Sequence, residues 1–189
     1  GTFSAWTKIL KEVPGSVLWL LNYNRLANSN IKKHAKEAGI DPKRIVFGEF
    51  LPKKDHLSRM VHADLVLDTF IYGGHTSTSD ALWMNLPVVT LRGDSFPSLV
   101  ALSILANLGM QELITDTPEE YVNLAVKIAK DKKYLSELKK KIIKNKRTFP
   151  LFNTEQFARD IEHLYQEMWK KYLKGEMPRT ITPSLNIEP

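Results

Sequence analysis

The sequence predicts an α/β fold: a Rossmann-like parallel sheet flanked by helices, with a C-terminal helical extension. Short apolar runs alternate with amphipathic segments through the first two-thirds of the chain. The runs are almost continuously apolar, which indicates strands covered on both faces. From Pro118 onward every periodic segment is helical. We therefore expect a Rossmann-like lobe over residues 1–116, helices packed on the same domain over 117–174, and a disordered tail over 175–189.

Four strands are expected in the lobe, each rich in Val, Ile, Leu or Phe. Single helix-like segments separate them, which is the pattern of βαβ units. A complete domain of this kind would begin with a strand, whereas this chain opens with a helical segment, so we expect a piece of a longer protein. The predicted strands are 17–21, 44–47, 65–68 and 87–91.

Helices are expected between and after these strands. Gly39 and Gly109 each follow an amphipathic segment, and glycine readily takes the left-handed conformation that ends many helices. The three C-terminal segments follow one another without an intervening strand. The predicted helices are 4–13, 30–38, 53–61, 78–84, 98–107, 119–130, 134–146 and 154–173.

Composition excludes several classes of function. The chain has no cysteine, which excludes disulfides, a thiol nucleophile and thiolate metal sites. The net charge is +6, and much of the positive excess comes from the segment between Lys127 and Arg147, on the outer face of an amphipathic helix. Such a face is usually solvated, so we expect no nucleic-acid partner. No apolar run approaches the roughly 20 residues of a membrane helix. We therefore expect a cytoplasmic protein without membrane contact.

The segment LDTFIYGGHTSTSDALW, residues 67–83, carries the strongest functional signal. A strand ends at Asp68, a glycine pair turns the chain, and a helix follows. A helix start exposes backbone N–H groups without an internal partner, and its dipole makes that end partly positive. Glycines let the backbone approach a phosphate closely. The pattern predicts a diphosphate site made by His75, Thr76 and Ser77.

Two further residues of this segment have more than one interpretation. Asp80 lies one turn into the helix, where its carboxylate can accept hydrogen bonds from a ribose. Alternatively the segment is a plain helix cap, with Thr76 or Thr78 accepting from the first amides and Asp80 favouring the dipole. Asp68 at the strand end is either catalytic or a capping residue. The row of hydroxyls after Gly-Gly-His favours the ligand-binding interpretation.

A second candidate segment follows the strand 44–47. Ligands of parallel sheets bind beyond the carboxyl ends of the strands, and the sequence LPKKDHLSR starts there. Lys53 can hold a ribose hydroxyl or a phosphate, and His56 can lie flat against a base. Arg59 returns to the same side of the helix. The alternative is that all three are ordinary surface residues.

The sequence lacks the motifs of several other catalytic centres. The five histidines are scattered without the spacing of a metal centre, so we expect no metal. The sequence contains no GxSxG elbow, no GxxxxGK[ST] phosphate loop and no GxGxxG fingerprint.

Taken together, these residues resemble a known family. The run ADLVLDTFIYGGHTSTSDALWMNLPVVTL is similar to the C-terminal catalytic lobe of the O-linked N-acetylglucosaminyltransferases and their SPINDLY-like relatives, glycosyltransferase family 41. So are VPGSVLWLL, RIVFGEFLPKKDHLSR and PLFNTEQFARDIEHLYQEMW, in the same order. The similarity extends over nearly the whole chain, from residue 4 to residue 178.

The resemblance implies a GT-B enzyme that transfers N-acetylglucosamine from UDP-GlcNAc to Ser/Thr of proteins, with inversion and without a metal or other cofactor. An upstream N-terminal lobe would carry the acceptor site and the catalytic base, after helical repeats, so this piece alone would be inactive. By the resemblance, Leu51 backbone, His56 and Arg59 form the uracil pocket, Lys53 and Asp80 hold the ribose, and the helix start binds the diphosphate at His75, Thr76 and Ser77.

Other assignments stay open at this point. Tyr72 stands where animal relatives have a smaller residue near the sugar, and some SPINDLY-like relatives use GDP-fucose, so an O-fucosyltransferase is one alternative. A non-catalytic module that binds nucleotide sugars or mediates interactions is another. A GT-B epimerase or a glycogen-synthase-like enzyme would share the scaffold, although these usually place acidic or arginine residues at the donor site.

Overall fold

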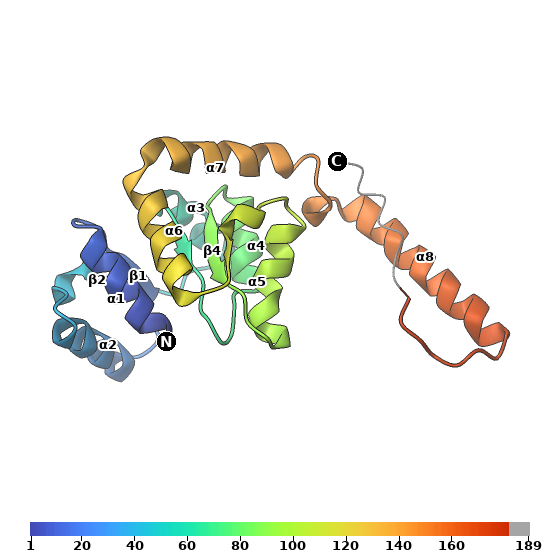
Figure 1. Ribbon diagram of the computed structural model, residues 1–189, viewed down its shortest axis with the longest axis horizontal. Helices are drawn as coiled ribbons and strands as arrows, with labels where there is room; N and C mark the ends of the chain where they lie inside the picture. Colours follow the sequence, from blue (N-terminus) through green and yellow to red (C-terminus); the bar gives the residue numbers. More distant parts are fainter. Residues whose placement is uncertain (182–189) are drawn as a thin grey trace.

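The computed structural model describes residues 1–181, and its strands are all parallel (Figure 1). In the described part of the chain the strands form two groups, with the orders β1-β2 and β3-β4-β5. In these pairs Leu18 lies opposite Ile45, and Val66 lies opposite Val88. The strands are β1 (Leu18–Leu21), β2 (Ile45–Gly48), β3 (Val66–Leu67), β4 (Val88–Leu91) and β5 (Ile114–Thr115).

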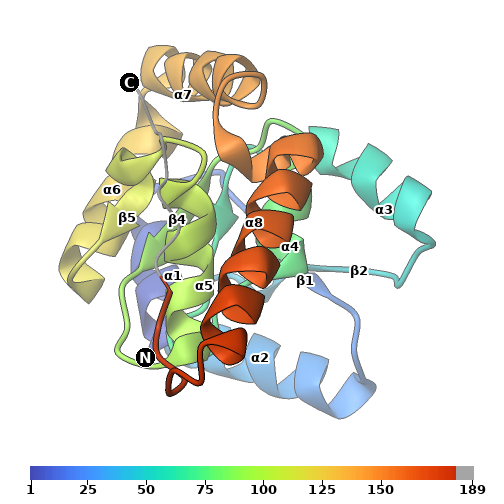
Figure 2. The ribbon, with the colours of Figure 1, turned by 90° about the vertical axis from the view of Figure 1, so that its right-hand side faces the viewer.

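Helices cover both faces of β4. Helix α6 lies on one side of this strand, and α4 and α5 lie on the other (Figures 1 and 2). Helix α1 packs along α6. The helices are α1 (Thr2–Glu12), α2 (Arg25–Glu37), α3 (Lys53–Arg59), α4 (Thr76–Trp83), α5 (Phe96–Ala106), α6 (Pro118–Lys130), α7 (Lys132–Asn145) and α8 (Thr154–Leu173).

Two hydrophobic clusters form the core. The larger one surrounds β4, where Val88 and Val89 are fully buried against residues of α4, α5, α6 and α7. The smaller one lies between β1, β2 and α2, and it includes Ile45. Trp6 and Leu67 pack against both clusters, so the two groups of strands share one folded unit.

The four predicted strands are present, with ends within two residues of the predicted ones. Gly39 and Gly109 take φ values of +78° and +67°, which confirms them as helix-ending residues. Helix α2 begins at Arg25, earlier than predicted, because the Asn24 side chain accepts from the Ala27 amide at 2.7 Å. Strand β5 was not predicted, since two residues are too few to show a period.

The C-terminal helices divide into two kinds. Helices α6 and α7 bury apolar side chains such as Ile128 and Ile142 against the lobe. Helix α8 contains no buried residue and extends away from the lobe (Figure 1). The packing expected over 117–174 is therefore wrong for α8, because its apolar stripe finds no facing surface among the described residues.

The last part of the chain has no helix or strand where it is described. Of the tail predicted to be disordered over 175–189, residues 182–189 lie outside the described residues. Within residues 1–181, none of the helices combines the length and apolar character needed to cross a bilayer.

The Tyr121 hydroxyl joins α6, α1 and the end of β3. It donates to the Asp68 carbonyl at 2.8 Å and accepts from Trp6 Nε1 at 3.3 Å, and its side chain is fully buried. Tyr121→Phe leaves the buried Asp68 carbonyl and the half-buried Trp6 Nε1 without this partner, so we expect the free energy of unfolding to fall by about 1–3 kcal/mol. Urea denaturation measures this loss.

Tyr165→Phe is the matched control, because the Tyr165 side chain is exposed on α8. We expect its free energy of unfolding to stay within about 0.5 kcal/mol of the parent chain. Equal effects of the two substitutions would contradict the role assigned to the buried hydroxyl.

Candidate functional site

The two segments singled out in the sequence meet at the carboxyl edge of the sheet. Lys53 begins α3 shortly after β2, and Asp80 is one turn into α4. The Lys53 ammonium forms an ion pair with Asp80 Oδ2. The Lys53 side chain is 58% exposed and that of Asp80 is 17% exposed, so the pair borders solvent at a place where ligands of parallel sheets bind.

The N-terminus of α4 is open. His75 is the residue before the helix, and no side chain of the described residues caps this end. Among residues 1–181, no carbonyl or side chain accepts from the amides of Thr76 and Ser77. Both residues are exposed. The amides and hydroxyls at this end are therefore available to an anion, where the helix dipole favours negative charge.

This geometry contradicts the plain-cap alternative. Thr78 is buried, and its hydroxyl donates to the Gly74 carbonyl at 2.9 Å instead of accepting from an amide. Helix α4 also begins at Thr76, two residues before the predicted start. The three predicted residues consequently occupy the helix mouth itself.

The His75 ring is held between two aromatic side chains. It stacks on Tyr72 with ring centroids 5.1 Å apart and an angle of 13°, and it meets Phe96 edge-on at 6.3 Å. Its Nε2 atom is buried and has no hydrogen-bond partner among the described residues. Buried polar atoms are normally paired, so this nitrogen indicates a place for a ligand atom.

The glycine turn needs residues without a side chain. A Cβ atom on Gly74 would lie 2.5 Å from Thr78 Oγ1 and 2.8 Å from Ser77 Oγ, which is closer than real contacts allow. A Cβ atom on Gly73 would lie 3.1 Å from the Pro97 carbonyl oxygen. The turn thus packs directly beneath the first turn of α4.

Asp68 holds this turn in place. Its side chain is buried, and Oδ1 accepts from the Gly74 amide at 2.6 Å while Oδ2 accepts from the Thr90 hydroxyl at 2.6 Å. Burial raises the pKa of the Asp68 carboxyl, and the hydrogen bonds from Thr90 and Gly74 oppose that rise. Within residues 1–181 the Asp68 side chain accepts from the turn and from β4 and from no amide of α4, so it braces the glycine turn and does not cap the helix.

Arg59 and His56 meet on α3. Arg59 Nη2 lies 2.9 Å from His56 Nδ1, and Arg59 Nη1 donates to the Glu49 carbonyl at 2.5 Å. The guanidinium also lies over the Trp19 ring, 5.3 Å from its centroid. Arg59 therefore braces the His56 ring against the loop after β2. Leu51 lies in that same loop and is half-buried.

Sequence reasoning missed two residues that support the site. Thr90 is a polar residue inside the buried strand run PVVTL, which is a visible signal for a hydrogen-bond partner. Trp19 lies in the strand run VLWLL, where nothing distinguishes it from an ordinary core residue.

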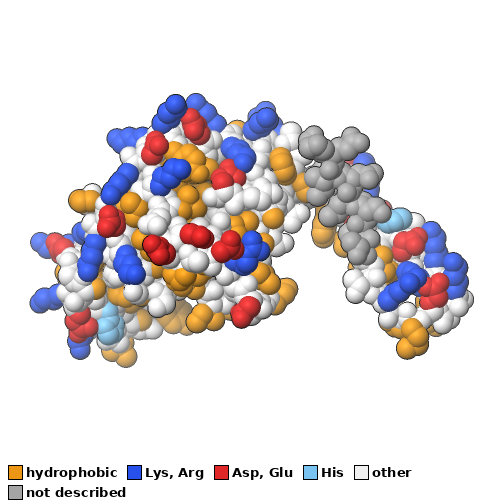
Figure 3. All heavy atoms as spheres, in the orientation of Figure 1, with side chains coloured by type: hydrophobic (Ala, Val, Ile, Leu, Met, Phe, Trp, Pro, Cys, Tyr) orange, Lys and Arg blue, Asp and Glu red, His pale blue; other side chains and the backbone are white. Residues whose placement is uncertain are grey.

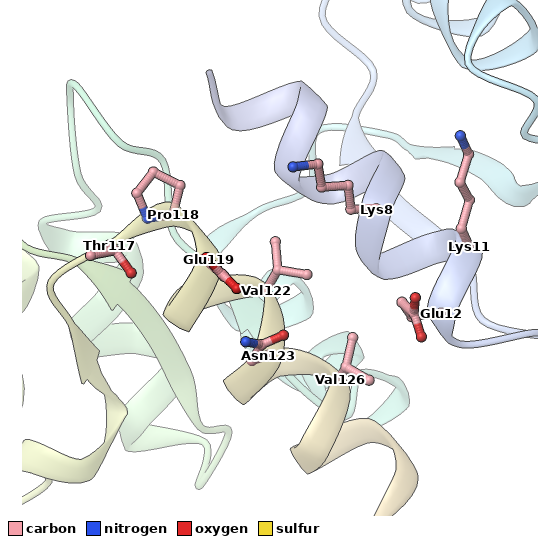
Figure 4. A pocket seen from close by; sticks show the side chains of 9 residues that line it. All are labelled: Lys8, Lys11, Glu12, Thr117, Pro118, Glu119, Val122, Asn123 and Val126. Carbon is pink, nitrogen blue, oxygen red and sulfur yellow. The ribbon is translucent and has the colours of Figure 1, made fainter.

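A separate groove of about 710 Å³ lies between α1 and α6 (Figure 4). It shares no residue with the predicted set. The predicted residues lie instead along the carboxyl edge of the sheet, which is bordered by helix starts and loops. The groove is lined by Lys8, Lys11, Glu12, Thr117, Pro118, Glu119, Val122, Asn123 and Val126.

The chain is similar to proteins of one family. It matches the family model of Glycosyl transferase family 41 over residues 1–161. It is 40% identical to the UDP-N-acetylglucosamine–peptide N-acetylglucosaminyltransferase of Caenorhabditis elegans, over 92% of this chain and 15% of that protein. It is 34% identical to the probable transferase SEC of Arabidopsis thaliana, over 93% of this chain and 18% of that protein.

A solved structure shows the same fold. The chain superposes on a lysine-to-methionine mutant of the Thermobaculum terrenum O-GlcNAc transferase with a TM-score of 0.84 and 29% identity. The match covers 89% of this chain and 33% of that one. The predicted α/β Rossmann-like fold and the resemblance to the family are confirmed. The chain spans less than a fifth of the length of the curated relatives named above.

The stability of the turn should depend on pH through Asp68. Its pKa is higher in the folded than in the unfolded chain, so the folded state favours the protonated carboxyl. That contribution is fully present below about pH 4 and is lost as pH rises through the folded pKa. Asp68→Asn cannot ionise. Relative to the parent, its free energy of unfolding should therefore rise as the pH increases above about 4.

Urea denaturation across this pH range measures the difference. Asp64→Asn is the control, because Asp64 is exposed just before β3. A pH-independent difference for Asp68→Asn, or an equal slope for Asp64→Asn, would contradict the assignment.

Proposed function

This chain belongs to glycosyltransferase family 41, and we propose that it is the donor-binding lobe of an inverting protein O-glycosyltransferase. The donor is UDP-GlcNAc and the acceptors are Ser/Thr hydroxyls of proteins. The observation that carries this proposal is the open start of α4, with the buried, unpartnered Nε2 of His75 beside it. The names of the relatives from Caenorhabditis elegans and Arabidopsis thaliana support the donor and the peptide acceptor.

The diphosphate binds at the mouth of α4. The amides and hydroxyls of Thr76 and Ser77 donate to its oxygens, and His75 Nε2 supplies a further donor when it carries the proton. In the transfer step the bond between the sugar and UDP breaks, and negative charge grows on the departing diphosphate. Donors that are already fixed in place stabilise that charge without reorganising. A divalent metal is not needed for this role.

The nucleoside lies along the edge toward α3. The Lys53–Asp80 pair binds the ribose hydroxyls, since one side chain donates and the other accepts. The His56 ring, braced by Arg59, stacks on uracil, and the backbone of Leu51 reads its edge. The base and the diphosphate are thereby held by two helices that start from neighbouring parts of the sheet edge.

The remainder of the reaction requires other parts of a longer protein. The acceptor site and the catalytic base belong to an upstream lobe that follows helical repeats in the full-length protein. The 189-residue chain alone is therefore expected to bind UDP weakly and to transfer no sugar. We place the protein in the cytoplasm, in keeping with its lack of cysteine.

A GDP-fucose donor is the second candidate, and Tyr72 is the observation that favours it. Its ring is 65% exposed and stacks on His75, beside the place proposed for the diphosphate. A bulky ring here narrows the space for the sugar. A module that binds the nucleotide without transferring sugar would have the same contacts, so the nucleotide preference and the activity are separate questions.

Calorimetric titration with UDP and GDP tests the donor site directly. We expect the 189-residue chain to bind UDP in preference to GDP. Lys53→Met removes one charge-assisted contact and should weaken UDP binding about tenfold, which corresponds to about 1.4 kcal/mol. Lys54→Met is the matched control, because this neighbouring lysine is exposed and has no ion pair among the described residues. It should bind like the parent.

Three results would change the proposal. The absence of heat with both nucleotides, from a sample shown to be folded, contradicts a donor lobe. Tighter binding of GDP than of UDP would make GDP-fucose, and not UDP-GlcNAc, the proposed donor. Equal losses in the Lys53 and Lys54 variants contradict the site, since they indicate a general effect of surface charge.

A further inference from the structure

We propose that Tyr72 and Phe96 are positioning residues, which hold the His75 ring so that its Nε2 atom is ready to bind the diphosphate at the start of α4. Tyr72 stacks on the imidazole with ring centroids 5.1 Å apart and an angle of 13°, and Phe96 meets it edge-on at 6.3 Å. Both arrangements are ones that aromatic pairs favour. The role rests on the proposed function, because it concerns the same diphosphate site.

Packing, and not hydrogen bonding, orients the Nε2 atom of His75. This atom is buried and has no hydrogen-bond partner among residues 1–181. The His56 ring on α3 is different, because Arg59 Nη2 lies 2.9 Å from its Nδ1 atom. For His75 the neighbouring groups that can fix the plane of the ring are the two aromatic side chains. We call Tyr72 and Phe96 together the aromatic clamp.

Phe96 is held in place by the start of α5. The Ser95 amide donates to Ser98 Oγ at 3.1 Å, which fixes the first turn of this helix. The Gly73 amide donates to the Pro97 carbonyl at 3.0 Å. That hydrogen bond ties the start of α5 to the glycine turn ahead of the imidazole. The backbone therefore sets the position of the Phe96 ring relative to the imidazole.

Tyr72 is held on the other side of the turn. Its carbonyl accepts from the Thr69 hydroxyl, within the segment that leaves β3. The Tyr72 side chain is 65% exposed and that of Phe96 is 80% exposed. Core aromatic residues stabilise a fold through the area they bury. These two rings bury little, so neither is a core residue, and the imidazole is the aromatic partner that they share.

The aromatic clamp acts on binding by ordering the imidazole in advance. A free side chain at a helix start samples several rotamers, and fixing it on binding costs free energy. The clamped ring has already lost this freedom. Its Nε2 atom, when it carries the proton, can donate to a phosphate oxygen without the further cost. A nucleoside has no phosphate, so the clamp should change the affinity for UDP and not the affinity for uridine.

NMR titration of the 189-residue chain with UDP and with uridine tests the clamp. Tyr72→Ala and Phe96→Ala should each weaken UDP binding about three- to tenfold, the equivalent of one aromatic contact. Uridine binding should stay unchanged. Tyr72→Phe keeps the ring and should bind UDP like the parent chain. Ile71→Ala is the matched control, because Ile71 is the neighbouring residue and is 85% exposed. It should also bind like the parent.

A double-mutant cycle with His75→Ala separates positioning from direct contact. In the His75→Ala background, Tyr72→Ala and Phe96→Ala should cause no further loss of UDP affinity. Losses as large as in the parent background would overturn the proposal, because the rings would then act without the imidazole. Unchanged UDP affinity in Tyr72→Ala and Phe96→Ala, alongside a loss in His75→Ala, would overturn the clamp and leave the donor site standing. A folded parent chain that does not bind UDP would overturn both.

Discussion

The two hydrogen bonds that the Asp68 carboxylate accepts hold together the end of β3, the glycine turn and β4. The turn packs closely against the first residues of α4 and thereby fixes them. The contact is so close that a side chain on Gly74 would collide with Thr78 and Ser77. The start of α4 is thereby presented at the sheet edge, and its first amides have no partner within residues 1–181. Burial of the Asp68 carboxyl raises its pKa and costs folding free energy, and such costs are typical of functional sites.

The second half of the site depends on this arrangement. Because α4 starts at the edge, Asp80 comes within reach of Lys53, which arrives on a different helix after a different strand. Within α3, Arg59 contacts His56 with one nitrogen and donates to the Glu49 carbonyl with another, and it thereby holds the His56 ring in place. The proposed donor site is therefore a line of contacts along one open edge. The basic residues of α7, prominent in blue along the top of Figure 3, lie on another part of the molecule.

Much of this was predictable from the sequence, and the exceptions have physical causes. Strand and helix periods indicated the α/β class, and the row of hydroxyls after Gly-Gly-His located the helix start to within two residues. The Lys53–Asp80 pair was not predictable by spacing, because its members are 27 positions apart in the sequence and strand β3 lies between them. The failed packing of α8 has another cause: amphipathic period shows that a helix has an apolar face, but not which surface covers it.

The central claim is that the open start of α4 binds the diphosphate of a nucleotide. Amide chemical shifts in 15N-labelled protein, recorded with UDP and with uridine, test it most directly. We expect UDP to shift the Thr76 and Ser77 amide signals strongly, and uridine, which has no phosphate, to leave them nearly unchanged. Shifts confined to other residues, or equal shifts with both ligands at Thr76 and Ser77, would contradict it.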